Sequence, residues 1–542
     1  MPFLILALSF YLFVGTAMPI YIDEILWKAI QARVGIDSGV TTGLWAMCES
    51  FQTKVPFFHK VYFALNEFIY GHSYSPQQIR YFGIFFGLLW LVQVLLLLDK
   101  KARPVFFLFI GTGIFPVTII MNRPETILLN AITFLILVAY LEIGRNRTVV
   151  GPAFWAFIKF RLARLFLAGF AFYLTMVAHP KGLLLLPLII AVVFLFKDRM
   201  DRIILSIFTA LLAWESLVFN LQRTSCANIP EFHLAWKYSG GVLMPQLIFT
   251  EPIEFLRKFF AMAVDFSEYF FMNLQDAGAK TGWLPIPTEG TFLMSTVNSL
   301  SLLLFWISIC TYGLALVAML IPFTKWKCSK KLQISYEVKI LVLGILTSLF
   351  VLSAFFINKT GYQGIIFIGL WYLGACLILQ ELLRPLVLPK KYFMGLAIGF
   401  FAVGAINFFC LSESLVPYAN KRMQGGLSNW NISMHRFEEH KQEIFKAATS
   451  CGFDLSSIQS HFLVDEIVFM VLGDHLQNPV FTDFVATPAS QRRDILGLLH
   501  KLGSAGGVFT CSPDSFFERN SLVTQRVGNY CCLSVKQAEV EK

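Results

Sequence analysis

The stretch NRPETILLNAITFLILVAYLEIGRNR, residues 122–147, decides the class of this protein. It begins with a short polar segment, continues through an apolar run over about 126–143, and ends in a loop that carries two arginines. An apolar run of this length is typical of a helix that crosses a membrane. Because Lys and Arg collect in cytoplasmic loops, the different charges of the two flanks also indicate the orientation of this helix.

The rest of the chain repeats this pattern. Its 542 residues are 56% hydrophobic and only 14% charged, whereas soluble domains carry roughly a quarter charged residues. Basic loops on one side of a membrane account for the net charge of +10, and we find no nucleic-acid motif. The pattern predicts an all-α polytopic membrane protein with about eleven spans, at about 3–20, 81–98, 105–121, 126–143, 165–179, 182–196, 203–220, 296–321, 340–357, 364–382 and 392–410.

The short loops between the predicted spans alternate in charge. One alternate set is dense in Lys and Arg, as in KDRMDR (197–202) and KWKCSKK (325–331). The other set is short and sparsely charged, as in NRPET (122–126) and AHPKG (178–182). We therefore predict a cytoplasmic N-terminus and an external C-terminus. The first span lacks a positive n-region and a small-residue cleavage site, so we interpret it as a retained anchor.

The topology leaves three large external segments. Two of them, 21–80 and 221–295, are loops of a transmembrane domain that we assign to residues 1–410. The third is the tail, 411–542, which is long enough to bury its own core and reads as a small external α/β domain.

Six cysteines fall in these external segments, where an oxidising exterior permits disulfides. They are Cys48, Cys226, Cys451, Cys511, Cys531 and Cys532. Cys451 with Cys511 is one possible pair, but sequence does not determine the connectivity. No CxxC or Cys/His spacing indicates a structural zinc site.

The first external loop carries two amphipathic patterns. DEILWKAIQARV (23–34) and VPFFHKVYFALNEFIYG (55–71) place apolar residues at helical spacing but are too polar to span, so we predict helices in the interface plane. Ser75 and Pro76 then predict an N-cap and an N1 proline at the start of the helix that enters the second span.

This loop resembles that of the GT-C glycosyltransferases, in the branch that contains protein O-mannosyltransferases and lipid A aminoarabinose transferases. That branch carries an Asp-Glu pair, a Lys-Pro-Pro or His-Pro-Pro turn and an arginine at the head of the next helix. The matching residues here are Asp23, Glu24, Lys54 with Pro56, and Arg80. Val55 stands where the first proline of the turn is usual.

Two further segments carry the same resemblance. NRPETILL (122–129) is similar to an Arg-x-Asp/Glu-x-x-Leu-Leu motif at the head of the fourth span. AHPKGLLLLPL (178–188) is similar to a Thr-Lys-Gly-Pro turn, with Lys181 and Gly182 aligned. The resemblance covers about residues 1–200, and beyond 220 it is one of general shape.

The resemblance implies inverting transfer of a sugar from a polyprenyl-phosphate or polyprenyl-diphosphate donor to an acceptor at the external membrane surface. Such a reaction needs a carboxylate at the acceptor hydroxyl, cations for the leaving phosphate and an apolar groove for the lipid. Asp23 is the candidate base, with Glu24 as a second carboxylate or metal ligand. Lys54, Arg123 and Lys181 are the candidates for the donor phosphate.

Further candidates for substrate binding are Glu125, His179, His233, Trp236 and Lys237, since aromatic rings beside polar groups suit sugar stacking. Each candidate also has a plainer interpretation. Asp23 and Glu24 can cap the following helix, the cations can contact lipid headgroups, and Glu125 can simply pair with Arg123. We interpret Arg80 as a structural anchor at the interface. No cofactor is indicated, and participation of a divalent metal stays open.

Two other functions fit a chain of this class. A transporter or flippase would be expected to show internal repeats and charges within its spans, whereas here the charges gather in external loops. An O-antigen-type polymerase or ligase would also have a large external loop. For the leading function the partners are a lipid-linked sugar donor and a lipid, glycan or protein acceptor, in a bacterial inner membrane.

Overall fold

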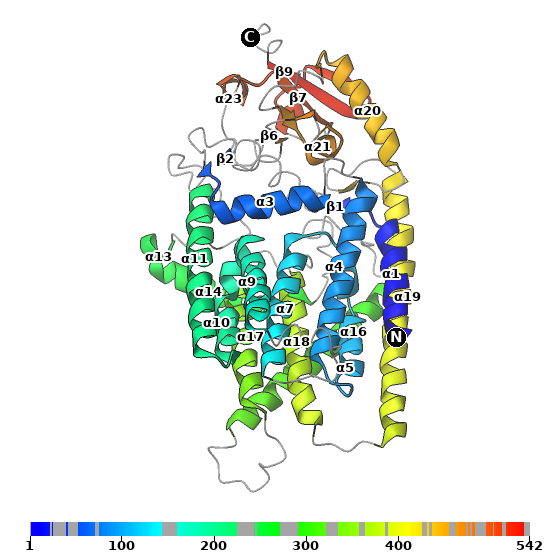
Figure 1. Ribbon diagram of the computed structural model, residues 1–542. Coiled ribbons are helices and arrows are strands. Elements are labelled where there is room, and N and C mark those ends of the chain that lie inside the picture. Colours follow the sequence, from blue (N-terminus) through cyan, green and yellow to red (C-terminus); the bar gives the residue numbers. More distant parts are fainter. Residues whose placement is uncertain are drawn as a thin grey trace. The chain divides into compact units, whose positions relative to one another are not determined.

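The computed structural model describes residues 2–21, 24, 40–41, 53–70, 75–143, 160–224, 243, 247–270, 291–320, 334–356, 364–384, 389–424, 431–432, 436–454, 462–472, 475–476, 480–482, 495–501, 503–511 and 516–535 (Figure 1). The chain forms two compact units. The helical unit consists of Met1–Ala17, Arg80–Leu217 and Gly241–Lys421. The mixed unit consists of Met18–Ile79, Val218–Gly240 and Arg422–Lys542.

Seven helices in the described part of the chain are long and apolar enough to cross a membrane. They are α4 (Pro76–Leu97), α7 (Pro124–Glu142), α11 (Arg199–Thr224), α16 (Phe292–Leu320), α17 (Tyr336–Phe355), α18 (Gly364–Leu383) and α19 (Lys390–Gln424). Shorter apolar helices are α1 (Pro2–Ala17) and the continuous pair η1 (Pro180–Leu185) and α10 (Leu186–Leu195). Helix α9 (Arg161–Val177) is of similar length and begins with Arg161 and Arg164. The predicted number of eleven spans stays a prediction.

The predicted span 105–121 is not one helix. It is divided into α5 (Arg103–Ile110) and α6 (Phe115–Thr118) by a turn in which Gly113 has a φ of 70°. Asn407 of α19 holds this turn, because its side-chain amide donates to the carbonyls of Gly111 and Gly113 and accepts from the Gly113 N–H. The sequence expectation was wrong here because apolar composition does not distinguish one long helix from two short buried ones.

Helices α7 and α18 form the core of the helical unit. Both are buried along almost their whole length, whereas α11 and α19 expose most of theirs. A helix that is apolar all round belongs inside a bundle, while outward apolar faces are those expected to meet lipid. Helix α7 packs against α9, α10 and α18, and residues near both of its ends, Pro124 and Leu141, are buried.

The C-terminal end of α7 is fixed by an ion-pair cluster. Arg161 Nε lies 2.6 Å from Asp201 Oδ1, and Arg164 Nη2 lies 2.7 Å from Asp201 Oδ2. The backbone N–H of Lys197 donates to Glu142, the last residue of α7, at 2.9 Å. Arg164 Nε also lies 3.6 Å from Glu142 Oε2, so these contacts join α7, α9 and α11 at this end of α7.

The mixed unit combines the first loop with the tail. Strand β1 (Ile20–Tyr21) pairs with β4 (Asn431–Ile432), and β2 (Val40–Thr41) pairs with β3 (Thr53–Lys54). The predicted amphipathic helix near 55–71 is α3 (Phe57–Tyr70). Ser75 caps α4 as predicted, since its Oγ accepts from the Gln78 N–H at 3.1 Å while the Gln78 side chain accepts from the Ser75 N–H.

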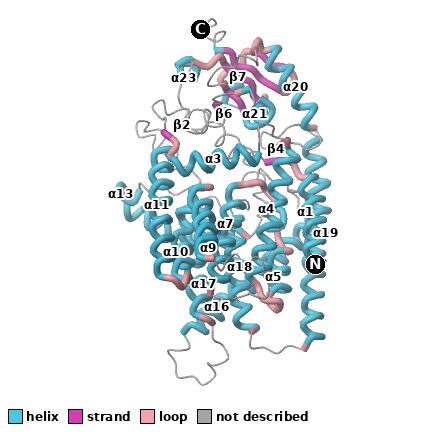
Figure 2. Tube along the Cα trace, in the orientation of Figure 1, coloured by secondary structure: helices cyan, strands magenta, loops and turns pink. Residues whose placement is uncertain are grey.

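A five-stranded sheet forms the centre of the tail (Figure 2). Its strands are β5 (Leu463–Val464), β6 (Val480–Phe481), β7 (Gly506–Thr510), β8 (Gln525–Val527) and β9 (Tyr530–Ser534), in the order β6-β5-β7-β9-β8. Strand β5 is parallel to β6 and β7, and β9 is antiparallel to β7 and β8. The accompanying helices are α20 (Phe437–Ser450), α21 (Glu466–Leu472), α23 (Ile495–Lys501) and α24 (Phe516–Arg519).

The neighbouring cysteines of β9 form two disulfides. Cys451, directly after α20, bonds Cys532, and Cys511, directly after β7, bonds Cys531. Adjacent residues of a strand face opposite sides of the sheet, so the neighbouring cysteines of β9 reach different partners. The pairing of Cys451 with Cys511 considered from the sequence is therefore wrong. Cys48 and Cys226 lie outside the described residues.

Candidate functional site

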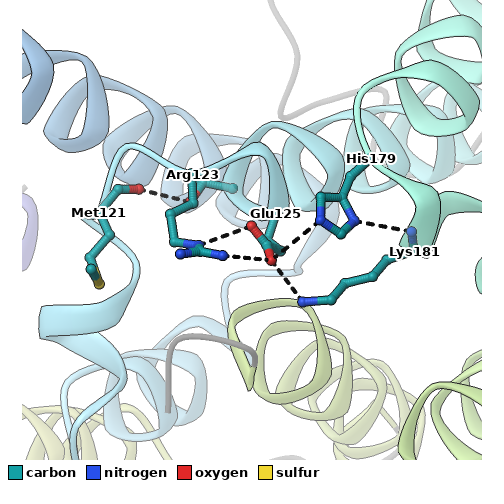
Figure 3. Close-up of polar contacts among 6 residues, drawn as sticks. Met121, Arg123, Glu125, His179 and Lys181 are labelled. Carbon is teal, nitrogen blue, oxygen red and sulfur yellow. Dashed lines mark hydrogen bonds and ion pairs between the residues drawn. The ribbon is translucent and has the colours of Figure 1, made fainter. Parts of the chain in front are cut away.

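Four polar side chains from two separate sequence motifs meet inside the helical unit (Figure 3). Glu125 is at their centre, with Arg123 Nε 3.1 Å from its Oε2 and Arg123 Nη2 3.2 Å from its Oε1. Lys181 Nζ lies 2.7 Å from Glu125 Oε1, and His179 Nε2 lies 3.8 Å from the same oxygen. We call Arg123, Glu125, His179 and Lys181 the four-residue cluster.

The segment before α7 places Arg123 and Glu125. Pro124 occupies the first position of the helix, and a proline keeps the residue before it extended. Arg123 accordingly has φ −113° and ψ 153°, and its N–H donates to the carbonyl of Met121 at 2.8 Å. Thr126 Oγ1 donates to the same carbonyl at 3.0 Å. Glu125 lies in the first turn of α7, where the helix dipole favours a carboxylate.

The turn after α9 places His179 and Lys181. His179 caps η1, and its Nδ1 accepts the N–H of Lys181 at 3.1 Å. In a neutral imidazole the other nitrogen then carries the proton, so Nε2–H faces Glu125. The Lys181 ammonium also lies 4.6 Å from the ring centroid of Phe356, which directly follows α17.

Close backbone contacts hold both motif segments in position. A Cβ at Gly182 would lie 1.8 Å from the carbonyl oxygen of Thr175, so only glycine permits this return of the chain against α9. A Cβ at Gly83 of α4 would lie 2.0 Å from the carbonyl oxygen of Ile120, in the segment that leads to Arg123. The segment before α7 and the turn after α9 are therefore held in place by backbone packing as well as by the pairing of their side chains.

All four members of the cluster are buried. Glu125 is 1% exposed, Arg123 and Lys181 are each 3% exposed, and His179 is 9% exposed at its side chain. Removing charges from water is costly unless they are paired and hydrogen-bonded, and the converging contacts on Glu125 supply that pairing. The arrangement holds a guanidinium and an ammonium side by side on one carboxylate, which fixes the direction of both cations.

The cluster lies at one end of α7, and Glu142 with Asp201 lies at the other. Glu142 is seventeen positions after Glu125 in the same α-helix, which corresponds to about 26 Å. The hydrocarbon core of a bilayer is roughly 30 Å thick. The two buried polar clusters of α7 therefore have the spacing expected of groups near opposite membrane surfaces.

The structure describes only some of the other residues that the sequence selected as candidates. Glu24 is fully buried in the mixed unit, and Lys54 belongs to β3 opposite Val40. Arg80 is also buried and packs against α1 at Gly15. The residues outside the described part of the chain are Asp23, His233, Trp236 and Lys237.

Sequence reasoning did not select Phe356. Its contact with Lys181 arises because α17 packs along η1 and α10, which brings the end of α17 to the turn after α9. No motif surrounds Phe356, and an aromatic residue at the end of an apolar span is too common to indicate a site.

Comparisons with known proteins give a limited set of matches. No family model matches the chain, and no curated protein matches it. Two solved structures are similar to it, the crystal structures of ArnT from Cupriavidus metallidurans bound to undecaprenyl phosphate and in the apo state. Sequence identities are 12% and 13%, TM-scores are 0.46 and 0.45, and both alignments cover 98% of this chain and 97% of the other.

Proposed function

We propose that this protein is a membrane glycosyltransferase of the GT-C type that transfers a sugar from a polyprenyl-phosphate donor to an acceptor at the external membrane surface. The observation that carries this proposal is the convergence of NRPET and HPKG in the four-residue cluster. Both segments were selected from the sequence as phosphate-binding candidates, and their side chains meet although 56 positions separate Glu125 from Lys181.

In this proposal Arg123 and Lys181 bind the donor phosphate. When the bond between the sugar C1 and the phosphate oxygen breaks, its electron pair stays on the phosphate, and nearby cations stabilise the charge that develops there. Glu125 holds the guanidinium and the ammonium in fixed directions before the donor arrives, so no reorganisation is needed during the reaction. His179 positions Glu125 by presenting Nε2–H toward it. Lys54 is assigned as a further phosphate contact by its motif.

The acceptor side of the reaction is assigned from the Asp-Glu motif. Asp23 accepts the proton of the acceptor hydroxyl, whose oxygen attacks C1 from the face opposite the phosphate, with inversion. Glu24 is a second carboxylate at this step or a ligand for a divalent metal. His233, Trp236 and Lys237 are assigned to sugar binding, since aromatic rings and polar side chains together suit a sugar face and its hydroxyls.

The remaining assignments rest on the predicted topology and on the family resemblance. We place residues 1–410 in the transmembrane domain and 411–542 in an external domain, with a cytoplasmic N-terminus, in a bacterial inner membrane. The lipid-linked sugar is the donor partner, and the acceptor is a lipid, a glycan or a protein. The spacing of about 26 Å between the two ends of α7 supports a site near one membrane surface.

Donor binding by the purified full-length protein tests the phosphate assignment. Undecaprenyl phosphate serves as the probe, and its affinity in nanodiscs is measured for wild type, Arg123→Gln and Lys181→Gln. A hydrogen bond to a charged group contributes roughly 1.5–3 kcal/mol, so each variant should bind the probe about tenfold to a hundredfold more weakly. Arg161→Gln is the control, because it removes a cation that pairs with a buried carboxylate at the other end of the helical unit.

A second assay tests the reaction itself. Radiolabelled polyprenyl-phosphate sugars are offered to the protein together with a membrane extract as the source of acceptors, and transferred label is counted. In the binding assay, wild-type affinity of Arg123→Gln and Lys181→Gln for undecaprenyl phosphate would remove both residues from the donor site. Flux of the lipid-linked sugar across sealed vesicles without any transfer would instead support the transporter or flippase.

A further inference from the structure

The disulfide between Cys511 and Cys531 has a carboxylate beside it. Cys511 follows β7 directly and donates its N–H to the carbonyl of Asn529 at 2.9 Å, so it lies diagonally across the strand pair from Cys531. The Cα atoms of the two cysteines are 5.0 Å apart. The Oε1 atom of Glu518 lies 3.2 Å from Cys531 Sγ. A disulfide sulfur carries no proton, so this contact becomes a hydrogen bond only when Cys531 is a thiol.

The segment that carries Glu518 is firmly held. Phe517 of α24 is fully buried, and its ring centroid lies 4.8 Å from that of Phe509 in β7. The N–H of Leu522 donates to the carbonyl of Phe517, and the N–H of Ser521 donates to that of Glu518. Ser521 has a φ of 54°, a conformation uncommon for a residue other than glycine. Contacts on both sides thus set the position of the carboxylate.

Three potential metal ligands therefore lie together. The Sγ atoms of Cys511 and Cys531 and a carboxylate oxygen of Glu518 all lie within 4.8 Å of one another. Zinc binds thiolate sulfur at about 2.3 Å and carboxylate oxygen at about 2.0–2.2 Å, so two ligands of one ion lie at most about 4.6 Å apart. Once the S–S bond is broken, the two sulfurs have to move apart to make room for a common ion, while the Glu518 oxygen is already within reach of both. Cys531 is buried while Cys511 and Glu518 are half-buried, so solvent reaches part of this group of residues.

We propose that Cys511, Cys531 and Glu518 form a zinc site when the tail is reduced, and that the disulfide is the closed form of this site. A dithiol reductant opens it: the reductant becomes a disulfide, and its two electrons and two protons convert Cys511 and Cys531 to thiols. Zinc then displaces the two thiol protons, and two thiolates with one carboxylate bind the ion. The tertiary structure brings the three ligands together, so the site has no CxxC spacing by which the sequence would indicate it.

The disulfide on the opposite face of the sheet has a different setting. Cys532 projects from β9 toward α20 and bonds Cys451, and within the described residues no third metal ligand accompanies this pair. Among the residues that the structure describes, only the Cys511–Cys531 pair therefore has a third potential zinc ligand beside it. The Cys451–Cys532 pair serves as an internal control for the experiment.

The test uses the full-length protein in detergent, reduced with a phosphine under anaerobic conditions and freed of metal. Zinc is added, the cysteines are alkylated over time, and the modified positions are mapped by mass spectrometry. We expect one equivalent of zinc to slow alkylation of Cys511 and Cys531 at least tenfold and to leave Cys451 and Cys532 unchanged. Cobalt in place of zinc should give the thiolate-to-cobalt charge-transfer band of a site with two sulfur ligands.

Two variants test the ligand set. Glu518→Gln should weaken zinc binding at least tenfold, whereas Arg519→Gln, which changes the next residue of α24, should not. Undiminished affinity in Glu518→Gln, equal protection of all four cysteines, or no protection at all would each overturn the proposal. Circular dichroism monitors the fold of the reduced protein, and loss of the sheet that zinc does not restore would overturn it as well.

Discussion

Lys181 and Glu125 are 56 positions apart in the sequence, yet the Lys181 ammonium lies 2.7 Å from the Glu125 carboxylate inside the helical unit. Glu125 lies in the first turn of α7 and Lys181 lies in η1, and each is almost completely buried. The pair joins the first turn of α7 to the turn after α9. Several experiments can determine what this pairing contributes to stability and to the proposed reaction.

Glu125→Gln should destabilise the protein strongly. The substitution leaves a buried guanidinium and a buried ammonium without the carboxylate they share, and breaking a buried ion pair costs roughly 3–5 kcal/mol. Thermal unfolding in nanodiscs measures this loss. Glu254→Gln is a matched control, because Glu254 also pairs with an arginine and a lysine, Arg257 and Lys258, but at the surface. Equal unfolding temperatures for both variants would contradict the role assigned to burial.

Gly182→Ala should displace Lys181 from Glu125. The added methyl group would meet the carbonyl of Thr175, which belongs to the backbone and cannot move aside alone. Overpacking of this kind costs about 1–3 kcal/mol, and the affinity for undecaprenyl phosphate should fall together with the unfolding temperature. Gly395→Ala is the control, since nothing lies within 4 Å of a Cβ at that position. A fully stable Gly182→Ala variant with normal donor binding would show that the turn is not constrained.

Phe356→Leu should remove the cation–π contact that helps to position the Lys181 ammonium. A desolvated cation over an aromatic ring is stabilised by about 2 kcal/mol, and leucine keeps the apolar contact without the ring. We expect a several-fold loss of affinity for undecaprenyl phosphate in the binding assay. Phe356→Tyr keeps the ring and should restore most of the affinity. If leucine and tyrosine behave alike, the ring has no part in positioning the ammonium.

Asp23→Asn should separate catalysis from donor binding. Loss of a general base lowers turnover by roughly 10²–10⁴-fold, whereas the affinity for undecaprenyl phosphate should stay at the wild-type value because the phosphate contacts are assigned to other residues. Label transfer and probe binding are measured on the same preparation. Unchanged turnover would remove Asp23 from the mechanism and leave Glu24 as the remaining carboxylate of the motif.

Asp465 makes the stability of the tail depend on pH. Its carboxylate accepts the N–H of Thr510 at 2.6 Å and that of Val468 at 2.8 Å, but burial is the larger influence and raises its pKa. A folded-state pKa above the unfolded value means that the folded tail holds the proton more tightly, so this contribution to stability is largest in acid and falls as the pH rises through the folded-state pKa.

Wild type should therefore gain stability relative to Asp465→Asn as the pH is lowered from neutral toward the unfolded-state pKa of about 4. The amide also offers one acceptor where the carboxylate offers two, so the variant should be less stable by about 1–3 kcal/mol. Unfolding temperatures of both proteins at several pH values measure the difference. A difference that is constant with pH would contradict a raised pKa.

Local patterns in the sequence determined a large part of this structure. The apolar runs predicted the long helices, the 3.6-residue spacing of apolar side chains predicted α3, and Ser75 before Pro76 predicted the start of α4. These features depend on residues close in the chain, whose preferences act before any tertiary contact forms. The resemblance to a glycosyltransferase branch likewise selected Arg123 and Lys181 from short motifs.

Only the tertiary structure decided which of these segments meet. The break between α5 and α6 depends on Asn407, nearly three hundred residues away. The bridging position of Glu125, the ring of Phe356 under Lys181 and the partners of Cys531 and Cys532 depend on how helices and strands pack. Sequence specifies each segment through short-range preferences, whereas a site made of buried charges exists only where packing brings them together and excludes water.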